Sequence, residues 1–142
     1  MELFRVLIVD DYEPWSRQLT AIIEKEPSYK VISTVSDGYA ALKKAEEIKP
    51  DLVLLDISLP TLNGIEVVRS LQRFHPKPFV VFVTQNATPS IVRAALEAGG
   101  NGYVLKTYAH RDLLPAIKIV CSGGRFLSAK LNTSTTENTT DR

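Results

Sequence analysis

Five short runs rich in valine, isoleucine and leucine alternate along the chain with segments of helical spacing, and this alternation limits the folds open to it. The runs at residues 4–10, 30–35, 51–56, 78–84 and 102–106 have the length and β-branching of strands. The segments after them repeat apolar residues every three or four positions, as amphipathic helices do. Such alternation produces a parallel sheet with helices on both faces. We therefore predict an α/β, doubly wound domain with a five-stranded parallel sheet.

The length and composition favour one domain, which we place at residues 1–128. The last 14 of the 142 residues, 129–142, are rich in threonine and poor in apolar residues, so we expect a flexible polar tail there. The 17 lysines and arginines nearly balance the 16 acids, which excludes a general attraction to nucleic acid or membranes. No apolar run reaches membrane-spanning length and no signal peptide is apparent, so we expect a cytoplasmic protein. The single cysteine, Cys121, falls in an apolar helical pattern and is interpreted as structural.

Polar side chains stand at the ends of four of the predicted strands. The first strand ends in Asp10 and Asp11, the third in Asp56, the fourth in Thr84 and the fifth in Lys106. Parallel strands all end at the same edge of a sheet, and the flavodoxin-like strand order 2-1-3-4-5 would make the first and third strands neighbours. These side chains are therefore candidates for a single site.

The types of side chain at these strand ends indicate phosphate chemistry. Three neighbouring carboxylates repel one another unless one holds a proton or a cation binds between them. Oxygen ligands without histidine or cysteine favour Mg²⁺, or Mn²⁺, over Zn²⁺. A lysine and a threonine hydroxyl can hold a phosphoryl oxygen. Acid, metal, lysine and hydroxyl together predict phosphoryl transfer.

Each of these residues alone also has an ordinary structural explanation. Asp11 could simply cap the helix that follows, Lys106 could be a solvated surface lysine, and Thr84 alone carries no information. Only their joint arrival at successive strand ends favours the functional interpretation.

Five features in a fixed order resemble the response regulator receiver domain of two-component signalling. They are VLIVDD, LLDISLPTLNG, FVTQNA, GYVLK and the five-fold β/α frame, and together they span residues 3–128. The segment 97–128 is most similar to receivers that precede a helix-turn-helix DNA-binding module. The resemblance implies that Asp56 accepts a phosphoryl group from a phosphohistidine of a sensor kinase or phosphotransfer protein. It implies a regulatory domain, not an enzyme.

The resemblance also implies roles for the neighbouring residues. Asp11, Asp56 and the backbone carbonyl of Ser58 would bind Mg²⁺ directly, and Asp10 would bind it through water. Lys106 would hold a phosphoryl oxygen.

The same resemblance implies a switch. Thr84 would move toward the new phosphate, and Tyr103 would turn inward behind it. The surface of the fourth helix, fifth strand and fifth helix would then meet a partner or a second copy of the chain. Neither direct DNA binding by this chain nor a membrane partner is expected.

Three departures from the family pattern and several rival classes complete the sequence interpretation. Gln85 stands where the family usually has a small residue and could hinder access to Asp56, Thr107 replaces a common proline, and no DNA-binding module follows residue 128. A flavodoxin would need a Ser/Thr/Gly-rich phosphate loop after the first strand, where acids stand instead, and the glycine fingerprint of a Rossmann dehydrogenase is absent. A phosphatase of the haloacid dehalogenase kind would need an aspartate where Ser58 stands. A degenerate, phosphate-independent interaction module remains the alternative, although no acid or lysine of the pattern is missing.

Overall fold

A computed structural model describes residues 2–128, and the tail predicted at residues 129–142 lies outside them. Six parallel strands form one sheet in the order β2-β1-β3-β4-β5-β6. The strands are β1 (Phe4–Val9), β2 (Tyr29–Val35), β3 (Leu52–Leu55), β4 (Phe79–Thr84), β5 (Gly102–Leu105) and β6 (Phe126–Leu127). The first five follow the predicted order.

The predicted strand number was wrong, because a sixth strand extends the sheet beyond β5. Phe126 pairs with Gly102, and Leu127 with Tyr103. A two-residue strand is too short to show an alternating pattern, so its pairing depends on contacts made elsewhere in the fold. β5 is consequently not the edge of the sheet.

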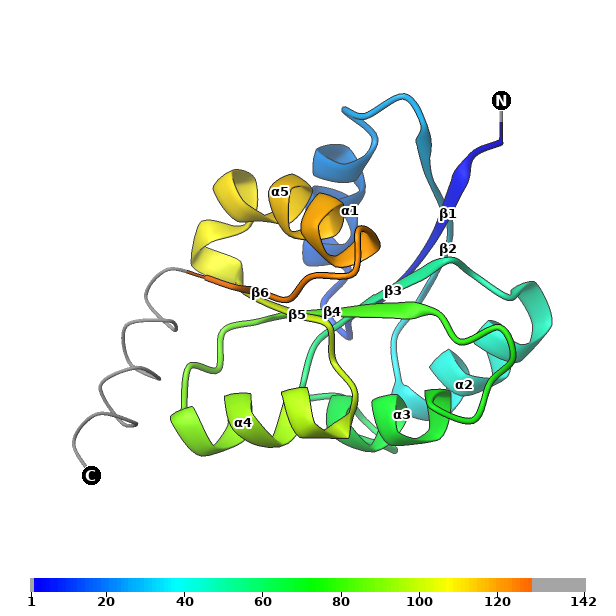
Figure 1. The fold of residues 1–142 in the computed structure, drawn as a ribbon. Helices are drawn as coiled ribbons and strands as arrows, with labels where there is room; N and C mark the ends of the chain where they lie inside the picture. Colours follow the sequence, from blue (N-terminus) through cyan, green and yellow to red (C-terminus); the bar gives the residue numbers. More distant parts are fainter. Residues whose placement is uncertain (1, 129–142) are drawn as a thin grey trace.

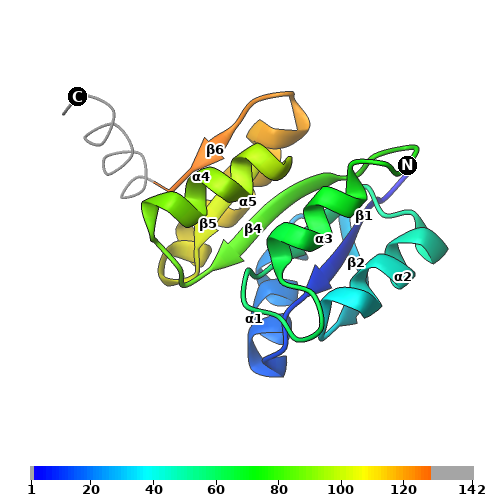
Figure 2. The same ribbon diagram turned by 90° about the horizontal axis from the view of Figure 1, so that it is seen from below.

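Within residues 2–128, five α-helices cover the two faces of the sheet (Figure 1). α1 (Glu13–Ile23) and α5 (Ala109–Cys121) lie on one face, and α2 (Gly38–Ile48), α3 (Gly64–Leu71) and α4 (Pro89–Ala98) lie on the other. A one-turn 3₁₀ helix, Lys106–Tyr108, joins β5 to α5. Figure 2 shows β6 running along the outer side of β5, between α4 and α5. No helix within residues 2–128 is long and apolar enough to cross a membrane.

A hydrophobic core fills each side of the sheet. β3 and β5 are buried along their whole length, which explains their continuous apolar sequences. Cys121 packs at the border of the core under α1 and α5, and burial raises the pKa of its thiol, consistent with the predicted structural role. Pro115 lies inside α5, and the helix continues on both sides of it.

The loop after β3 is shaped by a close backbone contact and a helix cap. A Cβ atom at Gly64 would collide with the carbonyl oxygen of Asp56, so only glycine lets α3 begin this close to the strand end. Asn63 and Glu66 form a reciprocal capping box at the start of α3. The loop that carries Asp56 is thereby fixed at its far end.

Candidate functional site

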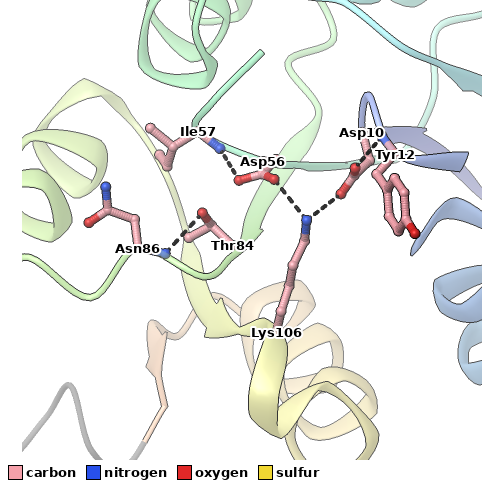
Figure 3. A network of polar contacts seen from close by, with 7 residues as sticks. All are labelled: Asp10, Tyr12, Asp56, Ile57, Thr84, Asn86 and Lys106. Atoms are coloured by element: carbon pink, nitrogen blue, oxygen red, sulfur yellow. Dashed lines mark hydrogen bonds and ion pairs between the residues drawn. The ribbon is translucent and has the colours of Figure 1, made fainter. Parts of the chain in front are cut away.

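A buried lysine lies between two carboxylates at the carboxyl edge of the sheet (Figure 3). Lys106 Nζ is 2.8 Å from Asp10 Oδ2 and 2.8 Å from Asp56 Oδ2. Asp10 follows β1 and Asp56 follows β3, and these two strands are neighbours. The structure therefore brings together three of the side chains that sequence analysis placed at one edge.

The lysine reaches this position across the end of another strand. It follows β5, and β4 lies between β5 and β3 in the sheet. Only a long side chain can span that distance and place a charge between the two acids. The ammonium also lies 5.1 Å from the centre of the Trp15 ring, a cation–π contact from α1.

Burial and charge act in opposite directions at this cluster. Burial alone would lower the pKa of Lys106, but its contacts with Asp10 and Asp56 raise that pKa above the ordinary value. Burial raises the pKa of Asp10, and the attraction of Lys106 opposes this shift only in part. Lys106 is therefore firmly charged and supplies the cation that the two carboxylates require.

The two acids next to each other at the end of β1 have different environments. Asp10 is buried, and its Oδ1 accepts a hydrogen bond from the backbone N–H of Tyr12 at 2.9 Å. Asp11 is exposed, and Tyr12, not Asp11, occupies the N-cap position of α1, without a side-chain capping bond. The alternative interpretation of Asp11 as the helix cap is therefore wrong.

The oxygen donors at this edge are of the type that a divalent cation prefers. Within residues 2–128, no three His, Cys, Asp or Glu side chains are grouped so that they could hold a metal. Asp10 Oδ2 is buried without a hydrogen bond, although its charge pairs with Lys106. This oxygen and the exposed Asp11 offer the hard, all-oxygen donor type that Mg²⁺ prefers. Ser58 lies exposed on the loop that follows Asp56.

Thr84 and Tyr103 are connected through the backbone of Asn86. Thr84 Oγ1 accepts a hydrogen bond from the Asn86 N–H at 3.3 Å, and the Tyr103 hydroxyl donates to the Asn86 carbonyl at 2.8 Å. Tyr103 is fully buried, and its ring lies 5.7 Å from that of Phe82. Tyr103 lies inward in this structure, and the inward turn predicted to follow phosphorylation stays a prediction. Gln85 is exposed beside Thr84.

Sequence analysis missed a second support for the loop after Asp56. Thr61 has a positive φ of 68°, which is unusual for a β-branched residue. Its hydroxyl accepts from the Tyr39 N–H at 2.9 Å and lies 3.1 Å from Asp37 Oδ1, to which it donates. These bonds join the loop after Asp56 to the start of α2. Nothing in the sequence near Thr61 predicts them, because Thr61 lies more than 20 residues from Asp37.

A doubly wound parallel sheet with paired acids and a lysine at its carboxyl edge defines the class of response regulator receivers. The family model for the response regulator receiver domain matches residues 6–118. The chain belongs to this family and is a receiver domain of two-component response regulators.

Curated relatives of the chain include a response regulator and a transcriptional regulatory protein. Response regulator GacA of Pseudomonas viridiflava is 34% identical over 129 residues, a match that covers 91% of this chain and 60% of GacA. Transcriptional regulatory protein DegU of Brevibacillus brevis is 31% identical over 127 residues, covering 89% of this chain and 54% of DegU. The chain thus spans less than two thirds of the length of these relatives.

Solved structures agree on the fold. A two-component response regulator of the LuxR family from Aurantimonas sp. SI85-9A1 is 27% identical, with a TM-score of 0.92 and coverage of 98% of this chain and 99% of that one. The receiver domain of the putative response regulator NarL from Mycobacterium tuberculosis is 26% identical, with a TM-score of 0.81 and coverage of 87% and 99%.

Proposed function

We propose that Asp56 is the phosphoacceptor of a phosphorylation-dependent switch, and that the donor is the phosphohistidine of a sensor kinase or phosphotransfer protein. The observation that carries the proposal is the buried Lys106 ammonium between the carboxylates of Asp10 and Asp56. A purely structural ion pair could lie exposed at the surface and would not require a buried cation at the sheet edge. A phosphoacceptor does, because its own charge repels the incoming anion.

The hydrogen bonds of Asp56 separate its two oxygens. Oδ1 accepts from the Ile57 N–H at 2.7 Å, and Oδ2 faces Lys106. In the transfer, a carboxylate oxygen of Asp56 bonds to phosphorus while the bond from phosphorus to the histidine nitrogen breaks, and that nitrogen keeps the electron pair. Lys106 then moves from carboxylate to phosphoryl oxygen and stabilises the charge there.

The carboxylates of Asp11 and Asp56 and the Ser58 carbonyl would hold Mg²⁺ directly and Asp10 would hold it through water, with Mn²⁺ as a substitute. When bound, the cation neutralises charge on the phosphoryl oxygens. Lys106 already pairs with Asp10 Oδ2, which fits a role for Asp10 through water and not as a direct ligand.

The output of the switch passes through Thr84 and Tyr103. A phosphoryl oxygen on Asp56 offers the Thr84 hydroxyl a charged hydrogen-bond acceptor. The same hydroxyl accepts a hydrogen bond from the backbone N–H of Asn86, so its movement would affect Asn86. Asn86 in turn holds the Tyr103 hydroxyl. The surface of α4, β5 and α5 is the proposed contact for a partner or a second copy. Because β6 covers the outer side of β5, such a partner meets β6 there.

We assign this switch to residues 1–128, acting in the cytoplasm as a regulatory domain and not as an enzyme. DNA binding in a longer protein would belong to a separate module, as the lengths and names of GacA and DegU suggest. No feature favours the phosphatase or the phosphate-independent module over the phosphoacceptor.

Intact mass after incubation with Mg²⁺ and a small acyl-phosphate donor tests the assignment. We expect one phosphoryl adduct on the wild type, none when the metal is chelated and none on Asp56→Asn. Asp51→Asn, at the opposite end of β3, is the matched control and should still be labelled. An undiminished adduct on Asp56→Asn would refute the site. Absence of an adduct on both the wild type and Gln85→Ala would favour the phosphate-independent module.

A further inference from the structure

Ser128, the last described residue, forms hydrogen bonds with residues on both sides of Lys106. Ser128, directly after β6, is fully buried. Its hydroxyl accepts a hydrogen bond from the Leu105 N–H at 3.0 Å and donates to Asp112 Oδ2 at 2.9 Å. Its own N–H donates to the Tyr103 carbonyl at 3.1 Å. A buried hydroxyl with both its donor and acceptor used is a specific contact rather than incidental packing.

The acid that receives the Ser128 hydroxyl is itself held in place. Arg111 donates to Asp112 from Nε at 2.8 Å and from Nη2 at 3.2 Å. The Arg111 guanidinium lies 4.3 Å from the centre of the Tyr108 ring. Together, these contacts orient the Asp112 carboxylate toward Ser128 at the start of α5.

Lys106 lies between the two points that Ser128 anchors. Leu105 immediately precedes it, and Asp112 lies in the first turn of α5, which follows the 3₁₀ turn at Lys106–Tyr108. The Ser128 hydroxyl therefore holds the chain on both sides of Lys106, through the Leu105 N–H before it and the Asp112 carboxylate after it. A shift of that backbone would move the ammonium relative to Asp10 and Asp56, whose 2.8 Å contacts leave little tolerance.

We propose that Ser128 and Asp112 are positioning residues for Lys106, and that β6 couples the phosphoacceptor site to the chain that leaves the receiver. The coupling half rests on the function proposed above. Ser128 contacts Tyr103 and Leu105, and both of these lie on the strand that ends at Lys106. A pull on Lys106 by a phosphoryl group thus reaches Ser128, the last described residue, through one peptide bond and the hydrogen bond from the Leu105 N–H to the Ser128 hydroxyl. Such coupling is reciprocal: if a phosphoryl mimic at the site changes the affinity of β6 for a partner, that partner changes the affinity of the site for the mimic by the same factor.

The positioning half can be tested without phosphorylation. We expect the ammonium hydrogens of Lys106, followed by NMR in the metal-free protein, to exchange roughly tenfold faster in Ser128→Ala than in the wild type. Ser122→Ala removes an exposed hydroxyl that bonds only the Ile119 carbonyl, and it should leave the exchange unchanged. A general loss of stability would speed exchange at all buried amides alike. An unchanged Lys106 signal in Ser128→Ala would refute positioning.

A second variant keeps the test decisive if Ser128→Ala does not fold. Asp112→Asn retains an oxygen acceptor for the Ser128 hydroxyl but loses the charge that pairs with Arg111. It should give a smaller acceleration in the same direction. If the Lys106 ammonium hydrogens of Asp112→Asn exchange at the wild-type rate, the proposed role of Asp112 is refuted.

The coupling half is tested with Mg²⁺ and beryllofluoride, a mimic of the phosphoryl group. In the wild type, binding should change hydrogen exchange at the amides of Leu105 and Ser128, and Ser128→Ala should weaken beryllofluoride affinity several-fold. Binding with no response at these amides would refute coupling. No binding to the wild type at all would instead refute the proposed function, and the Lys106 exchange experiment would still decide positioning.

Discussion

Replacing Lys106 with methionine tests whether the buried ammonium neutralises the acid pair. Methionine has a similar length but carries no charge, so it leaves Asp10 and Asp56 facing each other without a cation. Their side chains are only 1% and 11% exposed, and that of Lys106 is 6% exposed. Solvent therefore cannot replace the lost interaction.

The expected loss of stability follows from this burial. Removing one partner of a buried ion pair costs about 3 to 5 kcal/mol. We expect the lower end, about 3 kcal/mol at neutral pH, because Asp56 lies at the rim and Asp10 can take up a proton. For a domain of this size, the melting temperature should fall by roughly 10 °C.

The loss should depend on pH and on Mg²⁺. Burial already raises the pKa of Asp10, and without Lys106 that pKa rises further. An acid with a raised folded-state pKa stabilises the fold when protonated and destabilises it when ionised, so the deficit should shrink as the pH falls from about 7 to about 5. Mg²⁺ should stabilise the variant more than the wild type, because the cation would replace the positive charge that the acids lose with Lys106.

Urea denaturation at both pH values, with and without Mg²⁺, measures these effects. Lys118→Met on α5 removes an exposed lysine and should change the free energy of unfolding by no more than about 0.5 kcal/mol. A deficit for Lys106→Met below about 1 kcal/mol, the value of an exposed pair, would refute the reasoning. So would a deficit that is independent of pH.

Three further changes test other contacts of the site. Gln85→Ala should increase the rate at which small donors label Asp56, followed by mass spectrometry over time; an equal or slower rate would show that Gln85 does not restrict access. Tyr103→Phe removes the hydroxyl that bonds the Asn86 carbonyl and should cost about 1 kcal/mol in urea denaturation, whereas an unchanged midpoint would mean that the bond contributes nothing. The Arg111 guanidinium holds the pKa of Asp112 below its usual 3.8, so the ionised acid stabilises the fold above that pH. Asp112→Asn should therefore lower stability at neutral pH, and the difference from wild type should shrink as the pH falls below 3.8 and the carboxylate takes up a proton; a difference that stayed constant over this range would contradict this.

The sequence predicted the family and most of the fold because these depend on local patterns. Continuous apolar runs such as residues 52–55 are buried through both faces of a parallel sheet, and this burial is visible in the sequence itself. The acids, the threonine and the lysine follow directly from the ends of such runs. The family match over residues 6–118 confirms the predicted family.

Contacts between distant residues could not be predicted in the same way. Asp56 and Lys106 are separated by 50 positions, and Ser128 and Leu105 by 23. No periodicity connects residues so far apart, and a two-residue strand such as Phe126–Leu127 has too few positions to show one. The strand count was wrong for this reason.

By itself, then, the sequence determined which side chains reach the carboxyl edge of the sheet, because strand length and hydrophobic pattern set where each strand ends. Only the tertiary structure decided how they pair there. Lys106 lies between Asp10 and Asp56 because β1, β3 and β5 are brought to one edge and burial makes an uncompensated carboxylate costly. Ser128 bonds the Leu105 N–H next to Lys106 because the chain returns along β5 after α5. No local signal in the sequence specifies that path.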